Sequence, residues 1–157
     1  REEYKDVVRH ACPTPGACPF MGTAQTMCAM AEILGFAPHD NASTRSQSEK
    51  WHELRGRLPE VMYAWEHEIR PSDILSQSSF ENVVRYMMAT GGSTNSLLHI
   101  PALARQADFD ITPETFDAIS REVPLLQHIY PTTYLHHGGL CAAGGIGAVV
   151  EGAGCCW

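Results

Sequence analysis

The stretch SSFENVVRYMMATGGSTNSLLH, residues 78–99, decides the fold of this chain. Its apolar side chains recur at intervals of three and four, which is the spacing of one buried face of an α-helix: Phe80, Val83, Val84, Met87 and Met88. Ser78 and Glu81 have the spacing of a capping box at the start of that helix. The pair Gly91-Gly92 is expected to end it, and a second helix is expected to follow.

Outward from this stretch, the chain continues as a series of predicted helices. Thr23 is expected to cap one helix, and Ser46 with Glu49 has the spacing of a further capping box. Thr112 followed by Pro113 is typical of a cap and a first helical position. No stretch is a clear strand candidate, so the described pattern predicts a mostly helical chain.

Composition excludes several classes of protein. The chain has 157 residues, enough for one domain with a core, and its net charge of -7 without a Lys/Arg cluster argues against nucleic-acid binding. No apolar run approaches the roughly 20 residues of a membrane helix, and the charged start REEYKD is no secretory signal. Six cysteines without CxxC pairs favour a reduced, cytoplasmic protein over a zinc ribbon or a disulfide scaffold. The start within a predicted helix and the abrupt end at GAGCCW suggest a piece of a longer protein.

A candidate metal ligand lies in GACPFMGTAQTM, residues 16–27. Cys18 occupies a Gly/Pro-rich turn directly before a predicted helix, where the positive end of the helix dipole favours the thiolate that binds iron. The alternative is that Cys18 is a small buried hydrophobe, as many free cysteines are.

A candidate binding turn follows Gly91-Gly92. Ser93, Thr94 and Asn95 would stand at a helix N-terminus, where free N–H groups suit a carboxylate or phosphate. The alternative is an ordinary turn with a helix cap. His99, one turn further on, is interpreted as a core histidine rather than a base.

Four segments, in this order, resemble the dihydroxy-acid dehydratase/phosphogluconate dehydratase family, which includes the sugar-acid dehydratases. They are ACPTPGACPFMGTAQTM (11–27), RPSDILSQSSFENVVRYMMATGGSTNSLLH (70–99), ITPETFDAISREVPLL (111–126) and AAGGIGAVV (142–150). The resemblance covers nearly the whole chain, and GGSTN with an upstream GxC turn is a specific combination.

The resemblance implies an iron–sulfur hydro-lyase that also uses Mg²⁺. In the family, the cysteine of the GAC turn is a ligand of a two-iron or four-iron cluster, and that residue is Cys18 here, whereas Cys12 matches no ligand. The iron acts as a Lewis acid on the leaving hydroxyl, and magnesium holds the carboxylate end of the substrate. The resemblance also implies a homo-oligomer when the protein is complete.

The same resemblance implies that much of the enzyme lies outside this chain. The family places two more cluster cysteines and its magnesium ligands upstream, and its catalytic serine in a second, β-rich domain. Residues 1–157 are therefore expected to be a mostly helical fragment of an α/β N-terminal domain, with no catalytic residue of its own.

The expected substrate is a 2,3-dihydroxy sugar acid, such as a pentonate, dehydrated to a 2-keto-3-deoxy acid. Pro19 and Phe20 favour this interpretation, because many family members have two glycines there and the pentonate-type dehydratases do not. The alternative within the family is dihydroxy-acid dehydratase of branched-chain amino-acid synthesis. An alternative of another class is a non-catalytic helical fragment or interaction module.

Overall fold

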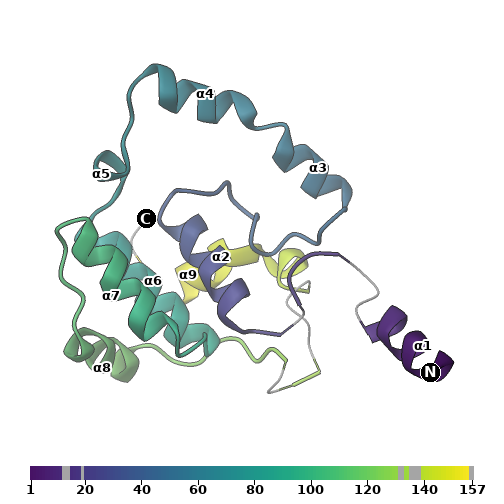
Figure 1. Cartoon of the computed structure of the whole chain (residues 1–157). Coiled ribbons are helices and arrows are strands. Elements are labelled where there is room, and N and C mark those ends of the chain that lie inside the picture. Colours follow the sequence, from purple (N-terminus) through teal and green to yellow (C-terminus); the bar gives the residue numbers. More distant parts are fainter. Residues whose placement is uncertain (12–14, 19, 131–132, 135–138, 156–157) are drawn as a thin grey trace.

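Helix α6, Gln77–Thr90, lies at the centre of the structure and packs against α2, α7, α8 and α9 (Figure 1). The computed structural model describes residues 1–11, 15–18, 20–130, 133–134 and 139–155. In chain order the helices are α1 (Glu2–Ala11), α2 (Thr23–Ile33), α3 (Glu49–Arg55), α4 (Leu58–Glu66), α5 (Pro71–Ile74), α6, α7 (Ser96–Gln106), α8 (Pro113–Glu122), the short 3-10 helix η2 (Cys141–Ala143) and α9 (Gly145–Gly152).

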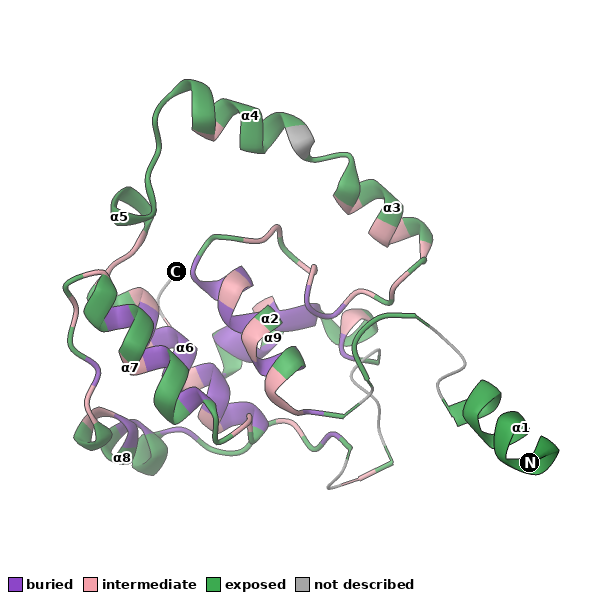
Figure 2. Cartoon of the chain, viewed as in Figure 1, coloured by how far each residue is buried: buried purple, intermediate pink, exposed green. Residues whose placement is uncertain are grey.

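The predicted apolar face of α6 is the core of the molecule. Phe80, Val83, Val84 and Met87 are buried, and Met88 packs against them at partial exposure. Burial of such a face is the dominant stabilising contribution to a helical fold. Figure 2 shows the buried residues gathered on α6 and on the helices around it.

The start of α6 differs from the predicted capping box. Ser76, not Ser78, is the N-cap, and its hydroxyl accepts a hydrogen bond from the Ser79 backbone N–H at 3.1 Å. Glu81 instead accepts from the side chain of Gln77, at 3.1 Å. The prediction was wrong because three overlapping serines offer several registers, and the local pattern does not choose between them.

Some of the other predicted helix ends agree with the structure, and others differ from it. Thr112 caps α8 as predicted, with Pro113 at its first position. Gly91 ends α6 in the left-handed conformation, at φ 62°. At α3 the N-cap is Ser48 rather than Ser46.

Helices α3, α4 and α5 arch away from the core, and α1 lies apart from it (Figures 1 and 2). None of the residues of α1, α3 or α5 is buried. Helix α4 exposes large apolar side chains, with Trp65 at 74% exposure and Val61 at 64%. These helices therefore contribute little to the core of this chain.

The described residues are helical and contain no strand. This confirms the mostly helical prediction, whereas the α/β character of the expected parent domain has no counterpart in this part of the chain. Nor does any helix among the described residues combine the length and the apolar character needed to cross a membrane.

Candidate functional site

The turn that carries Cys18 is held from both sides, and its thiol is exposed. Gly16, at φ 109°, lies against Ser46 so closely that a Cβ there would come within 2.9 Å of the Ser46 Cβ. On the other side, the Met21 N–H donates to the Tyr130 carbonyl at 2.9 Å, and Met21 is buried. The exposure of Cys18 argues against the interpretation as a buried hydrophobe.

Thr23, at the start of α2, links the two candidate sites. It does not cap the helix, because the N-cap is Gly22 and no side chain caps this end. Its hydroxyl oxygen lies 2.9 Å from the Ser93 hydroxyl and accepts a hydrogen bond from the Asn95 side-chain amide at 2.7 Å. The prediction of a Thr23 cap was wrong because its actual partners lie about 70 positions further along the chain.

The glycine before Ser93 allows this contact. A Cβ on Gly92 would come within 2.8 Å of the Met87 Cγ and 3.2 Å of a Thr26 methyl carbon, so only glycine lets the turn sit directly on α2. The Ser93 N–H then donates to the Thr26 hydroxyl at 3.0 Å. The structure thus places the Ser93–Asn95 turn on the first turn of the helix that follows Cys18.

Two of the three backbone N–H groups of this turn, those of Ser93 and Asn95, are already used within the protein. Asn95 N–H donates to the Ser93 hydroxyl at 3.3 Å, and Ser96 N–H donates to the Ser93 carbonyl at 3.0 Å. Together with the bond from Ser93 to Thr26, these contacts use the backbone N–H groups of Ser93 and Asn95. The predicted reason for binding an anion, namely free N–H groups, therefore does not apply to these two residues.

His99 is exposed, so its interpretation as a core histidine was wrong. Its ring borders an open groove of about 510 Å³ between α2 and α7. The residues that line this groove are Met27, Met30, His99, Ala102, Leu103 and Gln106. His99 lies one helical turn after Asn95, and its backbone N–H donates to the Asn95 carbonyl. The groove therefore begins one helical turn beyond the Ser93–Asn95 turn.

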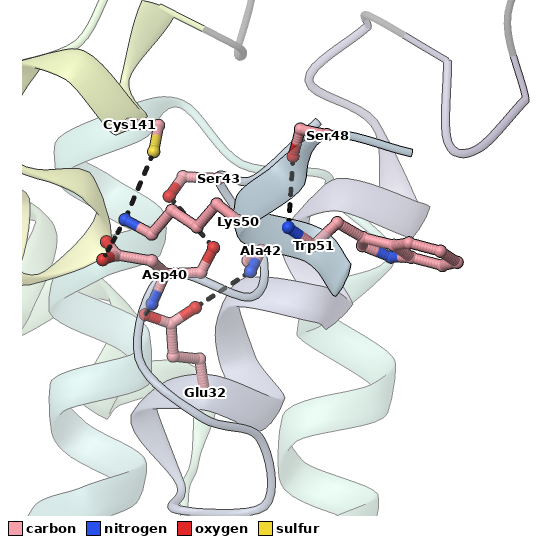
Figure 3. A network of polar contacts seen from close by, with 8 residues as sticks. All are labelled: Glu32, Asp40, Ala42, Ser43, Ser48, Lys50, Trp51 and Cys141. Atoms are coloured by element: carbon pink, nitrogen blue, oxygen red, sulfur yellow. Dashed lines mark hydrogen bonds and ion pairs between the residues drawn. The ribbon is translucent and has the colours of Figure 1, made fainter. Parts of the chain in front are cut away.

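A second polar network, shown in Figure 3, fixes the loop after α2. The buried Glu32 carboxylate accepts from the backbone N–H of Asp40 at 2.7 Å and of Ala42 at 3.0 Å. Lys50 donates to the Asp40 carboxylate at 2.6 Å and lies 3.6 Å from the Cys141 sulfur. Sequence reasoning missed this network, because its bonded partners lie up to 91 positions apart and form no motif.

Burial raises the pKa of Glu32 above 4.5, against the lowering effect of its two backbone hydrogen bonds. A raised pKa in the folded state means that Glu32 adds most to stability below pH 4.5, and that this contribution falls as the pH rises through the raised pKa. We therefore expect the free energy of unfolding of the wild-type chain, minus that of Glu32→Gln, to fall with rising pH in that window. Urea unfolding of both chains at a series of pH values checks this, and a difference that stays constant or rises would contradict it.

A cluster would need more ligands than the described residues bring together. No three His, Cys, Asp or Glu side chains lie close enough in this part of the chain to hold a metal ion. Cys18 offers one exposed thiol, which fits one ligand position of an iron–sulfur cluster. Cys12 lies outside the described residues. The described residues therefore bring no group of three such side chains together, and Cys18 is a candidate for one ligand position only.

Comparison with known proteins identifies the family of this chain. The family described as Dihydroxy-acid/6-phosphogluconate dehydratase N-terminal matches residues 1–153. The mitochondrial dihydroxy-acid dehydratase of Saccharomyces cerevisiae is 38% identical over 151 residues, which are 96% of this chain and 26% of that protein. The dihydroxy-acid dehydratase of Haloarcula marismortui is 40% identical over 150 residues, which are 95% of this chain and 26% of the relative.

The chain thus spans about a quarter of the length of these relatives. Both relatives are named dihydroxy-acid dehydratases. These names support the interpretation as a dihydroxy-acid dehydratase better than the interpretation as a sugar-acid dehydratase. The match over residues 1–153 shows that this chain belongs to the N-terminal domain family of the dihydroxy-acid and 6-phosphogluconate dehydratases.

Proposed function

We propose that this chain is part of a hydro-lyase that dehydrates a 2,3-dihydroxy acid to a 2-oxo acid, with dihydroxy-acid dehydratase of branched-chain amino-acid synthesis as the favoured activity. The observation that carries the proposal is the family match over residues 1–153, with relatives named as dihydroxy-acid dehydratases. The sugar-acid activity rests only on Pro19 and Phe20 in the sequence, and we keep it as the competing outcome.

We further propose that Cys18 supplies one thiolate ligand of an iron–sulfur cluster, and that the remaining ligands, the Mg²⁺ site and a β-rich domain lie elsewhere in the protein. When bound, such a cluster supplies a Lewis acid for the leaving hydroxyl. The contribution of this chain is to position these groups. The Cys18 turn is fixed on Tyr130 through Met21, and the Ser93–Asn95 turn is fixed on α2, the helix that follows Cys18. An α/β architecture of the complete domain, assembly into a homo-oligomer and a cytoplasmic location stay predictions.

The test is a comparison of substrates with the full-length protein prepared without oxygen. We expect 2-oxo acid to form faster from a branched 2,3-dihydroxy acid than from pentonates or other aldonates. Faster turnover of an aldonate would favour the sugar-acid activity, and no turnover of either class would reject the proposed function.

The 157-residue chain by itself is expected to be inactive on all these substrates. One cluster thiolate is too few, because such iron–sulfur clusters take about three or four protein ligands. The measurement is 2-oxo acid formation after anaerobic iron–sulfur reconstitution of the chain, with a sample lacking protein as the control. Turnover above that control would show that the chain holds a complete site.

A further inference from the structure

Helix α4 carries an apolar face that the core of this chain does not cover. Val61, Met62 and Trp65 are spaced at i, i+1 and i+4, so they share one side of the helix. Their exposed fractions are 64%, 45% and 74%, and Ile69, just beyond the helix, is 40% exposed. The helix stands in the arch formed by α3, α4 and α5, away from the helices around α6 (Figure 1). Apolar side chains gathered in this way typically mark a surface that binds another protein.

The start of α4 carries a net positive charge. Arg55 is the last residue of α3, and Arg57 is the N-cap of α4. The Arg57 Nε lies 3.6 Å from the Glu60 carboxylate, and the two side chains are 48% and 63% exposed, so this pair holds Arg57 only weakly. One positive charge remains after this pairing, and the N-terminal end of the helix dipole has the same sign.

The end of α4 is hollowed and carries a net negative charge. An open hollow of about 590 Å³ lies there, and its lining residues are Ala64, Trp65, Glu66, Glu68, Ile69 and Arg70. The two glutamates outnumber the arginine by one charge, and the C-terminal end of the helix dipole is negative as well. Trp65 belongs both to the apolar face and to this hollow, so the apolar and the acidic surface are continuous.

Opposite charges at its two ends make α4 complementary to a second α4 that runs in the opposite direction. A two-fold axis through the middle of the helix would place the arginines at the start of each copy beside the glutamates at the end of the other, and would bring the two apolar faces together. We propose that the apolar face of α4 binds the α4 helix of a second copy of this chain in this antiparallel way. The pairing does not depend on the proposed activity, because it involves no substrate.

A single pair of helices is smaller than a specific interface, which buries about 1,200–2,000 Å² in total. Helices α3 and α5 flank α4 in the arch and have no buried residue, so their surfaces are available to extend the contact. The competing occupant is the part of the polypeptide that this chain does not span, since the chain covers 26% of the yeast relative. The charge pattern favours the second copy, because α4 itself supplies the matching charges.

Photo-crosslinking in the full-length protein identifies what touches α4. Met62 is the central residue of the helix, so a two-fold axis through the middle of α4 passes close to it. Benzoylphenylalanine in place of Met62 is expected to cross-link with α4 of another copy on irradiation. Isotope-labelled and unlabelled protein are mixed beforehand, so that mass spectrometry of the cross-linked peptides separates bonds between copies from bonds within one copy.

The same photo-crosslinker in place of Leu98, which lies on α7 and is 70% exposed, is the control and should not reach α4. Cross-links from position 62 that join only residues of the same polypeptide would overturn the pairing and identify the rest of the protein as the occupant. The absence of any cross-link from position 62 would overturn it too.

Exchanging the charges tests the antiparallel direction. Arg57→Glu and Glu66→Arg each place like charges together at both ends of the pair. Each is expected to raise the dimer Kd about two- to thirty-fold, because an exposed ion pair occurs twice in a two-fold dimer. The double variant restores opposite charges and should return the Kd toward the wild-type value. Sedimentation velocity of the full-length protein measures the Kd, and single variants with unchanged Kd, or a double variant no tighter than the singles, would overturn the antiparallel arrangement.

Discussion

Replacing Cys18 by serine in the full-length protein is expected to reduce iron content to background and to abolish dehydratase activity. A serine hydroxyl stays protonated near neutral pH and is a much poorer iron ligand than a thiolate. The exposed position of Cys18, in a turn fixed by Gly16 and Met21, makes a folding defect a minor part of this effect. The measurements are iron content and visible charge-transfer absorbance of protein purified without oxygen.

Cys28 provides a matched control for this experiment. It is also an exposed free cysteine, and it lies ten positions further along, on α2. Cys28→Ser is expected to keep the iron and the absorbance, and the same holds for Cys12→Ser. If Cys12→Ser lost the cluster and Cys18→Ser kept it, the proposed ligand would be Cys12 instead.

Replacing Gly145 by alanine is expected to destabilise the folded chain by on the order of 2–4 kcal/mol. Gly145 has φ 68°, a conformation that costs a residue with a Cβ about 1–2 kcal/mol. A Cβ at this position would also overlap the Asp40 Oδ1, and displacing that carboxylate disturbs its ion pair with Lys50. Urea unfolding followed by far-UV circular dichroism measures the change.

Gly147, two positions further along in the same helix, is the control. A Cβ there would meet no atom within 4 Å, so there is room for the side chain. Because alanine is a better helix former than glycine, Gly147→Ala is expected to stabilise the chain by about 0.5–1 kcal/mol. Equal effects of the two substitutions would mean that the contact of Asp40 with α9 does not constrain the fold.

The sequence predicts best those features whose causes are local. The apolar spacing from Phe80 to Met87 identified the central helix, since burial follows directly from a periodic pattern. Thr112 with Pro113 identified the start of α8, because a cap and its helix are neighbours in the chain. The predicted N-cap of α6, Ser78, was wrong by two positions, because several serines at this helix start satisfy the same local pattern.

Features that depend on distant partners were outside the reach of such patterns. The Thr23 hydroxyl pairs with Ser93 instead of its own helix end, and no local signal at either residue indicates the other. The loop that Glu32 fixes through Asp40 and Ala42 belongs to the same class. The two candidate turns were identified separately from the sequence, and only the fold shows that the Ser93–Asn95 turn lies on α2, the helix that follows Cys18.

The separation of helices α3–α5 from the core has a consequence for spectroscopy. Trp51 and Trp65 both lie in this segment, on α3 and α4, and Arg55 lies over the Trp51 ring at 4.8 Å. Trp157 lies outside the described residues. The fluorescence of Trp51 and Trp65 therefore reports on the outer helices, whereas circular dichroism reports mainly on the larger set of helices around α6. An emission change on binding a partner can arise with the helical core fully intact.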